Sequence, residues 1–264
     1  MKQQMPGFAS EPPARTAGLL LRQPRSVAGI LALSVLGWVF LAWIALDMSH
    51  PFAQLTMPAS PSWSVANVLA ILSMWAIMMA AMMLPSALPM ILTFAHLGAR
   101  NGESARAYSF VAAYLLVWFA FSAAACVAQW MLQAMGWVDP MIVSTSAILT
   151  ALLLLIAGVY QFSPIKKVCL SRCRTPMGFL IGAWRPGVSG AFLMGSRHGL
   201  LCLGCCWALM ALLFVGGVMN LAWIAALSLA VAIEKLAPRG EWLAPALGLG
   251  LIAAGLAKLV AIIL

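Results

Sequence analysis

Long apolar stretches, separated by short polar segments, follow one another along almost the whole chain. A helix needs roughly 20 apolar residues to cross a hydrocarbon core, and most of these stretches reach that length. Continuous apolar runs favour helices over alternating barrel strands, because a helix satisfies its own backbone groups in lipid. The pattern predicts an all-α, multi-pass transmembrane helix bundle of about seven spans. They are Val27–Leu46, Val65–Phe94, Tyr108–Gln133, Met141–Tyr160, Ala191–Gly216, Met219–Glu234 and Trp242–Ile263.

The sixth and the first of these stretches each allow an alternative interpretation. The sixth stretch is short and follows the fifth after a tight turn at Gly216 and Gly217, so a hairpin that does not fully cross is the alternative. The first stretch is too long for a signal-peptide core and no cleavage pattern follows it closely, so we expect it to be retained. Residues 1–26 are predicted to be a basic, disordered cytoplasmic tail, and residues 27–264 a single transmembrane domain.

Composition agrees with a surface that faces lipid. Of the 264 residues, 64% are hydrophobic and only 8% are charged, whereas a soluble domain carries about a quarter charged residues. The mean hydropathy is +1.01. So few charges cannot cover a water-facing surface, and the lipid bilayer is the expected environment.

Basic residues fall in alternate loops. They occur in the N-terminal tail and in the second, fourth and sixth loops, whereas the first, third and fifth loops contain none. The positive-inside rule then places the N-terminus and the even-numbered loops in the cytoplasm, and the C-terminus outside. We expect a protein of the cell (inner) membrane. The net charge of +9 follows from this topology, so no nucleic-acid partner is expected.

Five of the six cysteines lie between residues 169 and 206, at the predicted cytoplasmic face. Spacings of three and four place Cys169 and Cys173 on one side of a helix, and likewise Cys202, Cys205 and Cys206. Cytoplasmic thiols stay reduced, and thiolates are soft ligands that suit copper(I), zinc or an iron–sulfur cluster. The pattern predicts a soft-metal site.

Neighbouring residues extend this candidate site. His198 precedes Cys202 by one helical turn and offers an imidazole. Arginines of the fourth loop, among them Arg174, favour the thiolate form through their positive charge. The alternative is that the cysteines are small apolar residues that allow close helix packing. We interpret Cys126, which stands alone in the third span, in that way.

The second stretch contains a run of methionines. Met74, Met78 and Met82 are spaced four residues apart and share one stripe of the helix. Thioethers are soft, neutral ligands that can pass copper(I) along inside a membrane. Methionines at helical spacing also serve as flexible core residues, which is the competing interpretation.

Two prolines follow the methionine run. Pro85 leaves the carbonyl of Ala81 without its helical partner, and Pro89 does the same to the carbonyl of Pro85. In a membrane, a carbonyl without its helical partner is accommodated by a kink of the helix or by a hydrogen bond from another polar group. We expect one of the two at this point of the helix.

The polar end of the sixth stretch and the long fourth loop carry two further candidates. Glu234 and Lys235 can lie at a solvated helix end, or Glu234 can pair with a fourth-loop arginine, serve as a hard ligand or accept a proton. The apolar middle of the fourth loop, from Met177 to Gly187, is expected to lie in the membrane interface. It can act there as a lid over the cysteines.

Four motifs of this chain occur together in one group of proteins. They are the methionine-rich run that ends at Pro85 and Pro89, the CxxxCR segment at residues 169–174, the HGxxCxGCCW run at residues 198–207, and the segment from Gly217 to Lys235. Together they resemble a bacterial family of predicted metal-binding integral membrane proteins of unknown function, over roughly residues 63–258. The resemblance implies a shared fold and a shared metal site, and it names no substrate.

These observations predict a non-enzymatic membrane protein that binds a soft metal at a cytoplasmic cysteine cluster. Copper(I) is the leading candidate, with zinc or another soft metal as alternatives, for transport or for delivery to cuproenzyme assembly. A metal chaperone or another membrane subunit is the expected partner. The alternatives are a thiol-redox protein that uses Cys169/Cys173 and Cys205/Cys206, and a scaffold with structural cysteines. The chain has no nucleophile elbow, HExxH motif or phosphate-binding loop.

Overall fold

The computed structural model describes residues 24–60, 62–99, 104–238 and 240–263. Within these ranges the chain is helical, and its only extended pairing is one isolated bridge between Val138 and Ser144. The predicted all-α bundle is confirmed. The expected N-terminal tail lies outside the described residues except for its last three, which begin the first helix.

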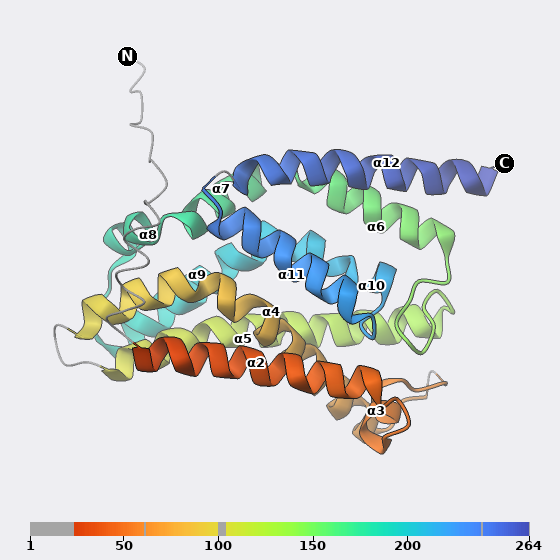
Figure 1. Cartoon of the computed structure of the whole chain (residues 1–264), viewed down its shortest axis with the longest axis horizontal. Helices are drawn as coiled ribbons and strands as arrows, with labels where there is room; N and C mark the ends of the chain where they lie inside the picture. Colours follow the sequence, from red (N-terminus) through yellow and green to blue (C-terminus); the bar gives the residue numbers. More distant parts are fainter. Residues whose placement is uncertain (1–23, 61, 100–103, 239, 264) are drawn as a thin grey trace, which may run out of the picture.

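The main helices run alongside one another, and successive helices point in opposite directions (Figure 1). The start of α2 and the end of α12 therefore lie at opposite ends of the bundle. Shorter helices lie toward the two ends: α7, α8 and η1 at one, and α3 and α10 at the other. The main helices are α2 (Pro24–Leu46), α4 (Val65–Ala99), α5 (Ser104–Ala134), α6 (Ala147–Tyr160), α9 (Gly187–Ala211), α11 (Leu221–Leu236) and α12 (Leu243–Ile263). The short ones are α3 (Pro51–Thr56), α7 (Pro164–Arg174), α8 (Pro176–Ala183), α10 (Leu213–Gly216) and the 3-10 helix η1 (Gly240–Trp242).

Fewer helices are long enough to cross a membrane than the sequence suggested. Five qualify by length and hydropathy, and the pair α6 and α7, bent by 63° at its break, makes a sixth if it counts as one span. The count among the described residues is therefore five or six rather than seven. The five are Val27–Leu46, Val65–Leu97, Ala105–Ala134, Gly187–Gly216 and Leu243–Ile263.

Two of the expected spans are short for local reasons. Helix α11 has 16 residues, which at about 1.5 Å per residue is less than the ~30 Å of a hydrocarbon core. Helix α6 was expected to begin at Met141 but begins at Ala147, where Ser146 accepts a hydrogen bond from the backbone of Leu149. The preceding residues form a turn instead, because the carboxylate of Asp139 accepts the backbone N–H of Val143 at 2.8 Å.

The polar contact expected at the prolines of α4 is present. The hydroxyl of Ser34 on α2 donates to the carbonyl of Ala81 at 2.8 Å, the carbonyl that Pro85 leaves without a helical partner. Gly37 allows this approach, because a Cβ there would lie 2.8 Å from the Cβ of Ala81. This contact joins α2 to α4 beside the methionine run.

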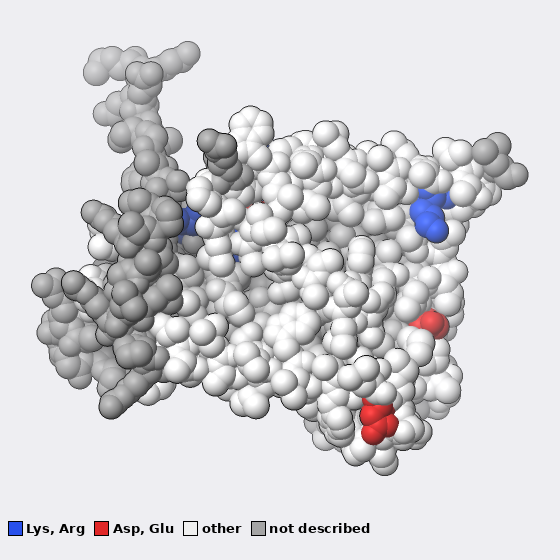
Figure 2. Space-filling model, in the orientation of Figure 1, with Lys and Arg blue, Asp and Glu red and all other residues white. Residues whose placement is uncertain are grey.

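Charged side chains are sparse along the face of the bundle seen in Figure 2 and appear mainly toward its ends. Asp47 follows α2, Asp139 lies between α5 and α6, and Lys258 is in the last part of α12. The opposite end carries the basic helix α7. Apolar sides and polar ends are what a chain that crosses a bilayer requires.

Candidate metal centre

The first pair of cysteines lies on the short helix α7, as their spacing predicted. Ser163 caps α7 by accepting a hydrogen bond from the N–H of Ile165, and Pro164 occupies its first turn. Proline is tolerated there because the N–H groups of a first turn have no partner within the helix. Cys169 and Cys173 are therefore one turn apart on the same side, and both are partly buried. A Cβ on Gly204 of α9 would lie 2.8 Å from the sulfur of Cys169. The missing side chain lets α7 approach α9 closely.

The second group lies on α9 and is fully inside the bundle. Cys202, Cys205 and Cys206 are each 1% exposed. The thiols of Cys205 and Cys206 both lie 3.0 Å from the carbonyl oxygen of Cys202. The thiol of Cys173 lies within hydrogen-bonding reach of the thiol of Cys205. The thiol of Cys202 lies within the same reach of the thiols of Cys205 and Cys206. We call Cys173, Cys202, Cys205 and Cys206 the cysteine cluster, and Cys169 lies beside it.

Cys202 is the point at which four helices meet. Its sulfur lies 2.9 Å from the ammonium of Lys235 on α11 and 3.2 Å from the hydroxyl of Tyr114 on α5. The same ammonium reaches the hydroxyl of Ser86 on α4 at 3.3 Å, and Tyr114 donates to the carbonyl of Met83 at 3.2 Å. A buried ammonium requires an anionic or strongly polar partner, and the sulfur of Cys202 and the hydroxyl of Ser86 are the groups within its reach.

Lys235 and Tyr114 were not identified from the sequence as parts of this site. Lys235 is 7% exposed and Tyr114 is fully buried, whereas a charge near a helix end was expected to reach the interface. The available signal was weak. It consisted of one lysine next to one glutamate near the end of an apolar helix, a position where an ionisable residue can also mark a site.

Glu234 has a different partner from the one predicted. Its carboxylate pairs with Lys166 of α7 at 2.7 Å, and both side chains are 1% exposed. One of the fourth-loop arginines, Arg174, instead donates to three backbone carbonyls at the end of α11, those of Glu234, Ala237 and Pro238. These carbonyls have no partner within the helix, so the guanidinium caps its C-terminus. Both contacts fix α7 against α11 next to the cysteine cluster.

His198 is buried among aromatic rings. Its ring centroid lies 5.5 Å from that of Tyr114, 5.8 Å from Phe179 and 6.0 Å from Phe110. Phe179 belongs to α8, within the segment expected to act as a lid, so this segment covers His198. The Nδ1 atom of His198 is buried and has no hydrogen-bond partner in the described part of the chain. The imidazole lies one turn from Cys202, in an aromatic rather than a thiol environment.

The methionine run lies in the core. Met74, Met78 and Met82 are at most 1% exposed and belong to the main hydrophobic cluster. Met82 lies one helical turn before Ser86, whose hydroxyl contacts the ammonium of Lys235. Because that ammonium also contacts Cys202, this end of the methionine run approaches the cysteine cluster. Core packing accounts for the burial of all three residues.

The arrangement of the side chains limits which metal site they can form. Within the described ranges, no three or more Cys, His, Asp or Glu side chains are arranged to hold one metal ion. The thiols of the cysteine cluster therefore lie near one another but do not form the tetrahedral four-ligand arrangement of a structural zinc site. Copper(I) accepts as few as two soft sulfur ligands, and methionine is one of them.

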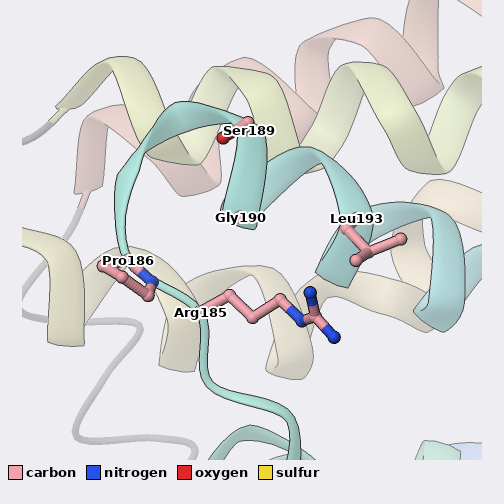
Figure 3. A pocket seen from close by; sticks show the side chains of 5 residues that line it. All are labelled: Arg185, Pro186, Ser189, Gly190 and Leu193. Atoms are coloured by element: carbon pink, nitrogen blue, oxygen red, sulfur yellow. The ribbon is translucent and has the colours of Figure 1, made fainter.

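A shallow pocket of about 360 Å³ opens at the start of α9 (Figure 3). Figure 3 shows the side chain of Arg185 extending from the segment before α9, while Ser189 and Leu193 lie on the first turns of the helix. Pro186 and Gly190 complete the lining. No cysteine, histidine or methionine lines it, so it is separate from the candidate metal centre.

Comparison with known proteins gives one match. A family model described as PpoB2, copper chaperone, matches residues 72–258, which is more than half of the chain. The matched region contains the methionine run, both groups of cysteines and Lys235. No curated protein and no solved structure matches the chain.

Proposed function

Because this chain belongs to the PpoB2 copper chaperone family, we propose that it is a membrane protein that binds copper(I) at the cysteine cluster and passes it to another protein. The observation that carries this proposal is the meeting of four cysteines from α7 and α9 beside the ammonium of Lys235. Membership of the family is the reason for choosing copper as the metal, and the buried sulfur atoms are ligands that suit copper(I).

Charge balance supports copper(I) at this place. Two thiolates and one copper(I) ion carry a net charge of −1, which is costly inside an apolar bundle unless a cation lies nearby. The ammonium of Lys235, 2.9 Å from the sulfur of Cys202, provides that cation. The loaded site is then neutral overall. Before loading, the same ammonium stabilises the thiolate at Cys202.

The exposure of the sulfur atoms suggests a route for the metal. Cys169 and Cys173 on α7 are partly accessible, whereas the three cysteines of α9 are buried. Copper(I) enters or leaves through the α7 thiols and exchanges, one ligand at a time, with the thiols of α9. Met82 and the rest of the methionine run extend this sulfur path along α4. The basic segment around α7 supports an entrance on the cytoplasmic side.

Anaerobic copper loading tests the proposal. The full-length protein in detergent is titrated with copper(I) against a chromogenic copper(I) chelator, beside the variant Cys202→Ser/Cys205→Ser/Cys206→Ser. The matched control is Cys126→Ser, because Cys126 is also a buried cysteine but lies alone on α5. We expect the triple variant to lose tight binding and the control to keep it. Equal binding by the triple variant and the unchanged protein would refute the proposal.

The same samples separate the alternatives. Zinc retained in place of copper, with the same dependence on the cysteines, would favour a structural metal. A cysteine-dependent midpoint potential without bound metal would favour the thiol-redox function. Neither result is expected from the copper proposal.

A further inference from the structure

A second feature lies at the same end of the bundle and is separate from the copper proposal. It is a groove of about 1660 Å³ formed by α7, α8, the middle of α9 and the start of α12. The elements that form it come from distant parts of the sequence but gather at one end of the molecule (Figure 1). We call it the basic groove. Its volume is far larger than an inorganic anion or a metal ion needs.

The charges that line the basic groove are all positive. Among the described residues, five lysines and arginines line it, and no aspartate or glutamate does. Two of the five are already engaged, Lys166 with Glu234 and Arg174 with backbone carbonyls. The side chains of Lys167, Arg172 and Arg197 are exposed, and none forms an ion pair with another described residue. Three uncompensated cations around one hollow favour an anionic ligand.

One polar side chain in the groove lacks the partners it needs. Gln161 lines the groove and is 2% exposed, yet neither its amide nitrogen nor its amide oxygen has a hydrogen-bond partner among the described residues. Leaving such buried groups unpaired destabilises the folded protein. A ligand that both accepts and donates hydrogen bonds, such as a phosphodiester with a neighbouring hydroxyl, satisfies both atoms.

The remaining lining is apolar and open to the surroundings. Phe162 is 40% exposed, Leu200 is 59% exposed and Trp242 is 73% exposed. Aromatic residues at such positions are typical of the membrane interface. The groove therefore combines an anion-binding part with an apolar part. An amphipathic ligand with an anionic head matches both, whereas a free anion leaves the apolar part unused.

We propose that the basic groove binds an anionic phospholipid, with its phosphodiester held by the three exposed cations and the amide of Gln161. The acyl chains lie along the apolar side chains near the start of α12. Basic pockets between membrane helices on the cytoplasmic side are suited to such headgroups. The bound lipid joins α7 to α12 and so supports the helix that carries Cys169 and Cys173.

Native mass spectrometry of the full-length protein in detergent tests this proposal. The protein is mixed with phosphatidylglycerol or phosphatidylcholine, and the lipid that stays bound is counted. The variant Lys167→Gln/Arg172→Gln/Arg197→Gln removes the exposed cations, and Lys258→Gln removes a cation in the last part of α12 as a control. We expect at least a tenfold preference for phosphatidylglycerol. The affinity for phosphatidylglycerol should fall on the order of a hundredfold in the triple variant, because each cation contributes roughly a factor of five.

The outcomes are distinct. The control should bind phosphatidylglycerol as the unchanged protein does, and Gln161→Leu should bind it several-fold more weakly. Equal lipid binding by the triple variant and the unchanged protein would overturn the proposal. So would displacement of the lipid by glycerol phosphate at a similar concentration, because the ligand would then be a soluble anion. Binding of an acidic peptide in place of the lipid would overturn it in favour of a protein partner.

Discussion

The cysteine cluster and the methionine run are both rich in sulfur and both buried, yet they are built differently. The cluster includes a contact with an ammonium, a tyrosine hydroxyl and a neighbouring ion pair, and it ties four helices together. The methionine run makes apolar contacts within the core. Polar groups in a core must be paired, so the cluster needs its partners and the run does not. On this difference we propose the cluster as the copper site and the run as at most an accessory to it.

The largest expected effect comes from the ion pair beside the cluster. Lys166→Met leaves the carboxylate of Glu234 buried without its partner, which should cost about 3–5 kcal/mol of unfolding free energy. The double variant Lys166→Met/Glu234→Met should recover most of that loss, because no charge then stays unpaired. Reversible unfolding in mixed detergent micelles measures both. Similar stability of the single variant and the unchanged protein would show that these charges are not buried as a pair.

A second variant removes the ionisable group at the centre of the cluster. Cys202→Ser replaces a thiol that can ionise by a hydroxyl that does not, so the ammonium of Lys235 loses a neighbour that can become anionic. We expect a loss of about 1–3 kcal/mol of unfolding free energy. Cys126→Ser is the matched control, and the expected loss is smaller because no charge contacts that thiol. Equal losses for both variants would remove the distinction between Cys202 and an ordinary buried cysteine.

The smallest effect is expected in the methionine run. Met78→Leu conserves volume in an apolar environment, and such exchanges usually cost less than about 1.5 kcal/mol. Copper(I) affinity at equilibrium should stay unchanged, whereas the rate of transfer to an acceptor should fall if the run carries metal. Stopped-flow transfer to a chelator gives both values. A large loss of affinity in Met78→Leu would make the run part of the primary site.

Parts of this fold and site could be predicted because they depend on local pattern. The length of the first apolar stretch set its limits at Val27 and Leu46, and the structure gives the same span. The spacing of Cys202, Cys205 and Cys206 placed them on one side of a helix, and Pro85 identified the carbonyl that Ser34 satisfies. Each conclusion needs only residues within a few turns of one another.

Other parts depend on contacts between distant residues and could not be predicted. Lys166 and Glu234 are 68 positions apart, and only the packing of α7 against α11 brings them together. Tyr114 contacts Cys202 from another helix, and nothing in its own neighbourhood marks it. The late start of α6 follows from the turn at Asp139, which hydropathy does not report. Side-chain partners inside an apolar bundle are selected by tertiary packing.

The most direct test of the central claim is the X-ray absorption spectrum of copper in the anaerobically loaded, full-length protein. We expect copper(I) bound by sulfur alone, with the signal retained in Cys126→Ser and in Met74→Leu/Met78→Leu/Met82→Leu. The signal should disappear in Cys202→Ser/Cys205→Ser/Cys206→Ser. Copper bound through nitrogen or oxygen, or a sulfur signal that survives loss of these three cysteines, would contradict it.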